Sequence, residues 1–320
     1  MLYPWQTEQW RSFSLQYEQK RLPHAIILTG VNGLGQLSLA NKMVATVLCE
    51  EPPISAPCGG CHNCQVFAAG NHPDHTFVGP DESGKQIKIE KIRELKQKHT
   101  LTANIAKWKT SIIWPAENMN ISASNSLLKL LEEPQSNTLL ILISIKPQLL
   151  PVTILSRCQK VPLAVPTNKQ AIEWIEEQDQ ETYKEIEIKR ALSLSNGAPI
   201  EALRLLSSNS LYFLEQISKD FNHVLSGAAN PVILAQQWQQ FDLHMVLYYL
   251  QLKLKQRLVK NIESSGNNIV INDWAMYDCI IDTTKLLSSS HNLNKVLLIE
   301  RFMVTAMNLS SSSSTLGRNN

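Results

Sequence analysis

Three glycines near residue 30 have the spacing of a phosphate-binding loop. Gly30, Gly33 and Gly35 follow an apolar run and precede residues at helical spacing. Such a loop cradles phosphate groups, because its backbone N–H groups and the dipole of the following helix both face the anion. The nucleotide-binding loop continues with Lys and then Ser or Thr, which reach the outer phosphates and magnesium. Here Gln36 and Leu37 stand at those positions, so we expect the loop's shape without its chemistry.

A second element of nucleotide hydrolysis is also absent. The apolar segment Ser111–Trp114 is predicted to be a short buried strand. In a nucleotide hydrolase of this architecture the strand would end in Asp-Glu, whose carboxylates hold magnesium and orient water. This chain continues with Pro115-Ala116-Glu117. Because proline cannot ligate a metal, we expect no intrinsic ATPase activity.

Four of the six cysteines lie close together, at Cys49, Cys58, Cys61 and Cys64. Two-residue gaps let consecutive thiolates converge on one tetrahedral ion, and four sulfur ligands leave no open coordination position. The spacing therefore predicts a structural zinc site, with four free buried thiols as the alternative. Cys49 lies at a predicted helix end, so one of three nearby histidines could replace it: His62, His72 or His75.

The elements that would position these residues alternate between apolar strands and amphipathic helices. The wholly apolar run at 138–145 can be hidden only in a sheet that is covered on both faces. From Thr167 onward the pattern is helical, opening with a capping box between Thr167 and Gln170. We predict one long helix at 231–260 within this part. The sequence thus predicts a parallel α/β sheet of P-loop type followed by an all-helical region.

Composition limits the classes of function. The chain has 320 residues, 43% of them hydrophobic, which allows two or three domains. A formal net charge of +2 argues against a protein held on nucleic acid by bulk electrostatics. No apolar run reaches membrane-spanning length and the first residues lack a signal-peptide pattern, so we expect a cytoplasmic protein with no membrane partner. In that compartment clustered cysteines indicate metal rather than disulfides.

Four segments together resemble the delta-prime family of bacterial DNA polymerase III clamp-loader subunits, which are AAA+ proteins. The resemblance is sharpest over residues 20–165. The matching segments are L-P-H-A at 22–25, the C-x-x-C-x-x-C run at 58–64, Ala116-Glu117 followed by N-S-L-L-K-L-L-E-E-P at 125–134, and Ser156-Arg157-Cys158.

The resemblance implies an AAA+ domain with a RecA-like parallel sheet at residues 1–165, carrying a zinc-binding insertion at about 49–75. A small helical lid at 166–207 and an all-α collar for oligomerisation at 208–320 would follow, with a disordered tail from about 310. In an active motor of this family an Arg follows the lid glycine, here Gly197. Ile200 stands at that position, although Arg204 one turn later could replace it.

The resemblance further implies a non-catalytic stator within the DNA polymerase III holoenzyme. Its partners would be the tau/gamma and delta subunits, and through the assembled loader the sliding clamp and primed DNA. Arg157, between Ser156 and Cys158, would be an arginine finger for the ATP site of a neighbouring subunit. Such a guanidinium neutralises charge on the transferred phosphoryl group. Without the resemblance, an ordinary solvent-exposed side chain would be the better interpretation of Arg157.

Two alternatives remain from the residues alone. The first is an active tau/gamma-like ATPase, which Gln36 argues against. The second is a zinc-ribbon module that binds nucleic acid, but residues 57–70 contain no Lys or Arg to contact phosphate. DNA contacts would instead come from Lys42, Arg93 or Lys129, although a solvated helix face is the better interpretation of these residues.

Overall fold

In the computed structural model the chain forms two units, Met1–Arg204 and Leu205–Asn320. The structure describes residues 2–51, 57–82, 85–178, 183–208, 210–265, 271–289 and 294–316. Each unit has its own hydrophobic core and is described separately below.

The first unit is built on a sheet of five parallel strands, which confirms the predicted parallel α/β architecture. The strand order is β2-β3-β4-β1-β5. All seven residues of β4 are buried, as expected for a strand inside a sheet covered on both faces. The strands are β1 (Ala25–Thr29), β2 (His75–Val78), β3 (Lys109–Ile113), β4 (Thr138–Ser144) and β5 (Gln159–Pro162).

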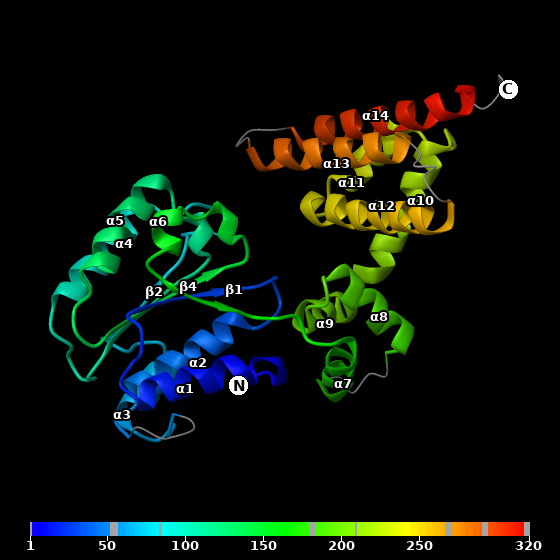
Figure 1. Ribbon diagram of the computed structural model, residues 1–320. Helices are drawn as coiled ribbons and strands as arrows, with labels where there is room; N and C mark the ends of the chain where they lie inside the picture. Colours follow the sequence, from blue (N-terminus) through cyan, green and yellow to red (C-terminus); the bar gives the residue numbers. More distant parts are fainter. Residues whose placement is uncertain are drawn as a thin grey trace. The chain divides into compact units, whose positions relative to one another are not determined.

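Helices cover both faces of this sheet (Figure 1). On one face, α4 (Ile89–Thr100), α5 (Ile121–Glu132) and α6 (Val152–Leu155) share a buried cluster with alternate residues of β1, such as Ala25 and Ile27. On the other face lie α1 (Thr7–Glu18) and α2 (Gln36–Leu48), of which α2 contacts β1, β3 and β4. Short elements complete this region: η1 (Pro4–Gln6), α3 (His62–Ala68), η2 (Ala116–Asn118) and η3 (Pro147–Leu149).

Two segments of this unit differ from what their sequences favour. The turn-forming residues at 76–86, such as Gly79-Pro80, favour a loop, but β2 begins at His75; only Val78 of this edge strand is buried, so its apolar pattern is weak. The alternation at 87–89 favours a short strand. Ile87 makes only an isolated bridge to Met119, and α4 begins at Ile89, because its buried residues recur at helical spacing.

Three helices follow the sheet, in the part of the chain that the sequence predicted to be helical from Thr167 onward. They are α7 (Asn168–Gln178), α8 (Glu185–Leu194) and α9 (Pro199–Ser207). The sequence favours a start of the second helix at Glu181, which lies outside the described residues. Gly197 ends α8 with φ +78°, and its N–H donates to the Leu192 carbonyl, an arrangement that suits glycine after a helix.

The second unit contains α10 (Ser210–Leu225), α11 (Pro231–Trp238), α12 (Leu243–Ser265), α13 (Ile271–Ser289) and α14 (Lys295–Leu316). The single helix predicted at 231–260 is wrong, since α11 and α12 are separate. Asp242 starts the new helix by accepting the His244 N–H at 3.0 Å through its side chain. The helix α14 continues beyond position 310, where we placed the start of a tail, and residues 317–320 lie outside the described part.

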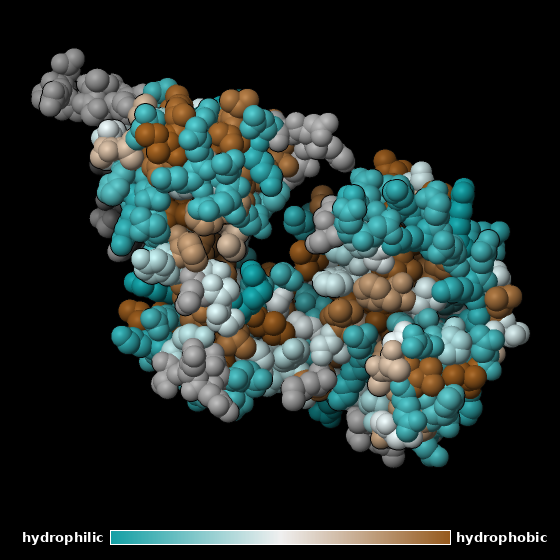
Figure 2. Space-filling view, turned by 180° about the vertical axis from the view of Figure 1, so that it is seen from behind, coloured by the Kyte–Doolittle hydropathy of each residue, from teal (hydrophilic) through white to brown (hydrophobic). Residues whose placement is uncertain are grey.

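The helical unit combines a buried aromatic core with exposed apolar side chains. Phe221 and Phe302 stack with ring centroids 5.5 Å apart, and Trp238 is fully buried. Figure 2 shows apolar patches on the surface of this unit. Among its exposed apolar side chains, Tyr212 is 72% and Leu297 is 59% exposed. Within the described residues, no helix combines the length and apolar composition needed to cross a membrane.

Candidate functional site

The glycine loop connects β1 to α2, as the sequence predicted. Gly33 and Gly35 have φ values of +86° and +78°, a left-handed conformation that glycine adopts at little cost. The side chain of Gln36 turns back onto the loop and donates a hydrogen bond from Nε2 to the Val31 carbonyl at 2.7 Å. It is almost fully buried. The residue that replaces the phosphate-binding Lys therefore ties the loop to itself.

The N-terminal segment lies directly on this loop, a contact that the sequence did not predict. Gln6 donates from Nε2 to the carbonyls of Leu34 and Gly35, both at 2.8 Å. The Trp5 indole N–H donates to the Leu34 carbonyl at 2.9 Å. A β-carbon built on Gly35 would lie 2.4 Å from the Tyr3 ring. The loop is thus covered by side chains of the same chain.

Aromatic contacts hold this covering segment in place. The rings of Tyr3 and Trp5 stack at 5.1 Å, and Trp174 of α7 meets both edge-on at 5.6 and 5.3 Å. Edge-to-face and stacked pairs of this kind add stabilisation beyond the area that they bury. The segment is therefore fastened both to the loop and to α7.

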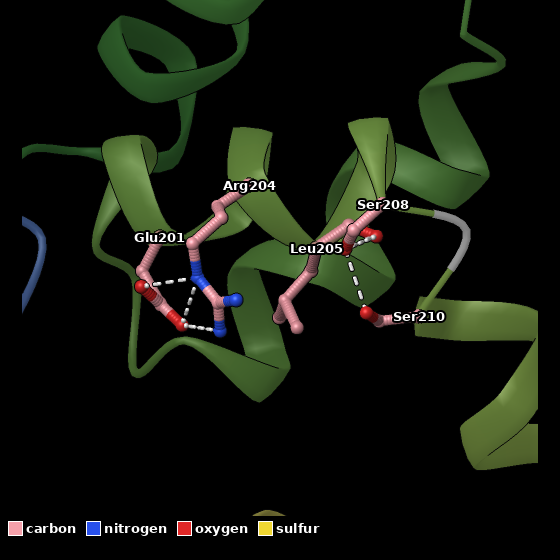
Figure 3. Close-up of polar contacts among 5 residues, drawn as sticks. All are labelled: Glu201, Arg204, Leu205, Ser208 and Ser210. Atoms are coloured by element: carbon pink, nitrogen blue, oxygen red, sulfur yellow. Dashed lines mark hydrogen bonds and ion pairs between the residues drawn. The ribbon is translucent and has the colours of Figure 1, made fainter.

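Helix α9 contacts the other side of the loop. The Ile200 N–H donates to the Gly33 carbonyl at 3.3 Å, and a β-carbon on Gly33 would lie 2.6 Å from that of Glu201. Arg204, the possible replacement for the missing lid arginine, is turned toward Glu201 on its own helix (Figure 3). Its guanidinium donates to the Glu201 carboxylate at distances down to 2.6 Å. Glu201 and Arg204 therefore form an ion pair within α9.

The positions after β3 and β4 carry no cluster of carboxylates. Pro115 follows β3 as predicted, and Glu117 accepts the Ile145 N–H at 3.2 Å through Oε1. Ser144, at the end of β4, accepts the Lys146 N–H at 3.3 Å. These side chains cap the neighbouring backbone at the carboxyl edge of the sheet, where ligands of open α/β folds bind.

Arg157 lies in the turn after α6 with 37% of its side chain exposed. Its Nη2 atom is 2.8 Å from Oε1 of Glu132, the last residue of α5. Its Nη1 atom donates to the Thr153 carbonyl at 3.0 Å and contacts the Ser156 hydroxyl at 3.4 Å. The structure thus brings together two segments that the sequence singled out separately, 125–134 and 156–158.

The two neighbours of Arg157 have structural contacts. The Ser156 hydroxyl donates to the Thr153 carbonyl at 3.1 Å. Cys158 is buried in the cluster beneath α5 and α6, and this burial raises the pKa of its thiol to about 11. A buried thiol that stays protonated is a poor nucleophile. Of the three residues, Arg157 alone presents a charged group at the surface.

The four predicted cysteine ligands do converge. The sulfur atoms of Cys49, Cys58, Cys61 and Cys64 all lie within 4.8 Å of one another. The Cys49–Cys61 and Cys58–Cys64 sulfur separations are both 3.9 Å. Zinc–sulfur bonds of about 2.3 Å at tetrahedral angles place sulfurs about 3.8 Å apart. The spacing therefore fits one tetrahedral metal ion, and the three histidines are not part of this described cluster.

The environment of the sulfurs differs within the cluster. The N–H groups of Cys61 and Gly60 favour the thiolate of Cys58 and lower its pKa to about 7. Burial instead raises the pKa of Cys64 to about 12. Since a metal binds thiolates, its binding would release the remaining protons.

Other polar residues considered from sequence have local partners. The His24 ring meets the Leu131 carbonyl at 3.0 Å, so its Nε2–H caps the end of α5. Lys42 lies 4.3 Å from the centroid of the Trp10 ring, a cation–π contact. Arg93 is exposed on α4.

Comparisons with known proteins agree with these features. A family model described as "DNA polymerase III, delta subunit" matches residues 5–167. A Pseudomonas aeruginosa protein named DNA polymerase III subunit delta' is 31% identical over 95% of this chain and 96% of the relative. A Haemophilus influenzae protein of the same name is 30% identical over 82% of this chain and 74% of that relative. A gamma subunit-related structure from Thermotoga maritima has a TM-score of 0.56 at 17% identity, covering 94% of this chain and 99% of that one, which shows similarity of fold.

Proposed function

Because this chain belongs to the family of DNA polymerase III delta-prime subunits, we propose that it is a non-catalytic subunit of a bacterial clamp loader. In this role it would join tau/gamma and delta subunits and help to load the sliding clamp onto primed DNA. The names of its relatives support the family part of the proposal. The residues of the glycine loop support the absence of ATP hydrolysis in this subunit, and those of the 156–158 turn support a contribution to the ATP site of a neighbour.

The observation that carries the non-catalytic role is the covered glycine loop. Gln36 binds the loop's own backbone, and the Tyr3 ring occupies space directly against Gly35. No carboxylate pair follows β3 to hold magnesium. An active tau/gamma-like ATPase would need a loop open to phosphate and a Lys at position 36. The subunit would therefore act as a stator, with the loop serving as a rigid strand–helix junction.

We assign Arg157 as an arginine finger that acts on the ATP site of a neighbouring subunit. Its guanidinium is partly exposed, and the turn that carries it is anchored by buried Cys158. A planar guanidinium supplies paired donors to phosphoryl oxygens, and its charge opposes the negative charge of the transition state. The chain would thus contribute to hydrolysis at a site that it does not itself contain.

The proposed architecture follows from the same family. Residues 1–165 would form the AAA+ domain, residues 166–207 the lid, and residues 208–320 a collar that joins subunits. Exposed apolar residues on the second unit, among them Tyr212 and Leu297, support a surface that is covered in an assembly. Contacts with DNA would come from the assembled ring in the cytoplasm.

We propose zinc as the ion held by Cys49, Cys58, Cys61 and Cys64. The near-tetrahedral sulfur spacing and the all-thiolate donor set suit this metal. Zinc would cross-link the end of α2 to α3 and supply no reaction chemistry, since the four sulfurs close its coordination sphere. A zinc-ribbon that binds nucleic acid remains the less supported alternative, because residues 57–70 carry no basic side chain.

Two assays test the non-catalytic assignment. The isolated chain should neither bind nor hydrolyse ATP, and the double variant Gln36→Lys with Leu37→Ser should also fail to bind it, because Tyr3 and Gln6 still cover the loop. Reconstituted tau/gamma and delta subunits should load the clamp poorly until this chain is added. ATP turnover by the isolated wild-type chain would instead favour the active-ATPase alternative. Full loading without the chain would contradict a role in the loader.

A further inference from the structure

We propose that Glu132 is a positioning residue that orients Arg157 toward the neighbouring ATP site. The inference rests on the proposed arginine-finger function and extends it to a second residue. The pair is specific: Oε1 of Glu132 lies 2.8 Å from Nη2 of Arg157, whereas the adjacent Glu133 has no described ion pair. The geometry joins the end of α5 to the turn after α6.

The position of Glu132 is unfavourable for its own helix. It is the last residue of α5, where the negative end of the helix dipole disfavours a carboxylate. The carbonyl of Leu131 at this end accepts a hydrogen bond from His24, so Glu132 is not needed as a cap. Pairing with Arg157 offsets the unfavourable charge. An acidic residue here is therefore better explained by its partner than by helix stability.

The contacts leave the guanidinium partly available. An arginine has five N–H donors in a planar fork. The Thr153 carbonyl and the Ser156 hydroxyl are within reach of Nη1, and Glu132 binds Nη2. Among the described residues, the Nε–H of Arg157 has no acceptor. The two Nη atoms of the guanidinium are thus held, while its Nε–H can still donate to an anion.

This arrangement favours positioning over sequestration. An arginine side chain loses considerable conformational entropy when it is held in one geometry. If Glu132 already restricts the side chain of Arg157, less conformational entropy is lost when the guanidinium binds phosphate. If Glu132 instead held Arg157 away from its target, removal of the carboxylate would accelerate hydrolysis. Removal of the Glu132 carboxylate should therefore slow ATP hydrolysis if Glu132 positions Arg157, and accelerate it if Glu132 sequesters Arg157.

The test is steady-state ATP hydrolysis by a reconstituted loader with clamp and primed DNA. Glu132→Gln keeps the shape of the side chain and removes its charge. We expect kcat to fall by about two- to tenfold, as for loss of one partly exposed charged contact, with the KM for ATP unchanged. Glu132→Asp keeps the charge on a shorter side chain and should recover part of the rate. Glu133→Gln, the matched control, should leave kcat at the wild-type value.

A double-mutant cycle separates this inference from the proposed function. In the Arg157→Ala background, Glu132→Gln should have no further effect, since its role passes through Arg157. A persistent effect in that background, an unchanged kcat, or a faster rate in the single variant would overturn the positioning role. If Arg157→Ala slows hydrolysis while Glu132→Gln does not, the finger stands and only the role of Glu132 fails. If Arg157→Ala has no effect, the proposed arginine-finger function itself fails.

Discussion

Gly35 lies directly beneath the ring of Tyr3, so that a β-carbon at this position would come within 2.4 Å of the ring. The contact joins the N-terminal segment to the glycine loop, and Gln6 reinforces it with two hydrogen bonds to loop carbonyls. In a nucleotide-binding loop glycine allows the backbone to approach phosphate. Here the same absence of a side chain allows an aromatic ring to approach the backbone.

This contact predicts that Gly35→Ala destabilises the protein through steric conflict as well as backbone strain. Gly70 is the matched control, because its φ of +77° is nearly that of Gly35 but a β-carbon added there would meet nothing within 4 Å. Gly70→Ala should cost about 1 kcal/mol of unfolding free energy for the left-handed conformation. Gly35→Ala should cost about 1–3 kcal/mol more, as for overpacking. Urea unfolding measures both, and equal losses would contradict the close contact.

Removal of the metal should lower stability without abolishing the fold. The four cysteines lie between the end of α2 and α3, in the part of the chain that precedes β2. The buried cluster beneath α4 and α5 contains none of them, and its one cysteine is Cys158. Chelation should therefore reduce the melting temperature by about 2–4 °C for each kcal/mol lost, with the helical circular-dichroism signal retained at room temperature.

Metal analysis supplies the control for this experiment. The wild-type chain should contain one zinc ion, Cys58→Ser should contain less, and Cys279→Ser, outside the cluster, should retain the wild-type amount. Loss of all helical signal on chelation would show that the whole unit depends on the ion. A metal-free wild-type protein with unchanged stability would show that the cysteines are free thiols.

Burial of His99 predicts a loss of stability in acid. Its Nε2 atom lies 2.6 Å from the Ser111 hydroxyl, and burial, with a smaller contribution from Lys109, lowers the pKa of His99 to about 4. Unfolded histidine titrates near 6.5, so between these values the unfolded chain binds more protons than the native one. The free energy of unfolding should then fall as pH decreases from about 6.5 to 4, by at most about 1.4 kcal/mol per pH unit for this group.

His99→Gln tests this dependence, because glutamine can keep a hydrogen bond to Ser111 but does not titrate. The variant should show a shallower decline of unfolding free energy below pH 6.5 in urea titrations at several pH values. His75 and His72, whose pKa values burial also lowers, would contribute to the remaining slope. An identical slope in wild type and variant would mean that His99 does not remain neutral in the native state.

The locally encoded features were predictable from sequence. The glycine loop and the cysteine cluster depend on residues a few positions apart, so their spacing alone predicted a strand–loop–helix and a four-sulfur site. The apolar run of β4 likewise predicted a sheet covered on both faces. By contrast, β2 has a single buried residue and gave no clear pattern. The break between α11 and α12 depends on the cap at Asp242, which the surrounding apolar periodicity concealed.

Contacts between distant segments were not predictable. Gln6 reaches the carbonyl of Leu34 across 28 positions, and no periodicity in either segment indicates their contact. The ion pair of Glu132 with Arg157 also depends on tertiary structure, although both residues lie in segments that the sequence singled out. The chemical types of the residues were therefore predictable, whereas their partners required the fold.

In the proposed function, Arg157 acts on an ATP site supplied by another subunit. The most direct measurement is ATP hydrolysis by the reconstituted loader with clamp and primed DNA, comparing wild type with Arg157→Ala, Arg157→Lys and the exposed control Arg11→Ala. We predict that Arg157→Ala lowers kcat by about tenfold or more, up to the loss of about 10³-fold that is known for removal of an arginine finger. Arg157→Lys should recover little of this rate, because lysine lacks the planar fork of donors. Arg11→Ala should match wild type. Unchanged hydrolysis with Arg157→Ala would contradict the arginine-finger role and leave the subunit as a scaffold alone.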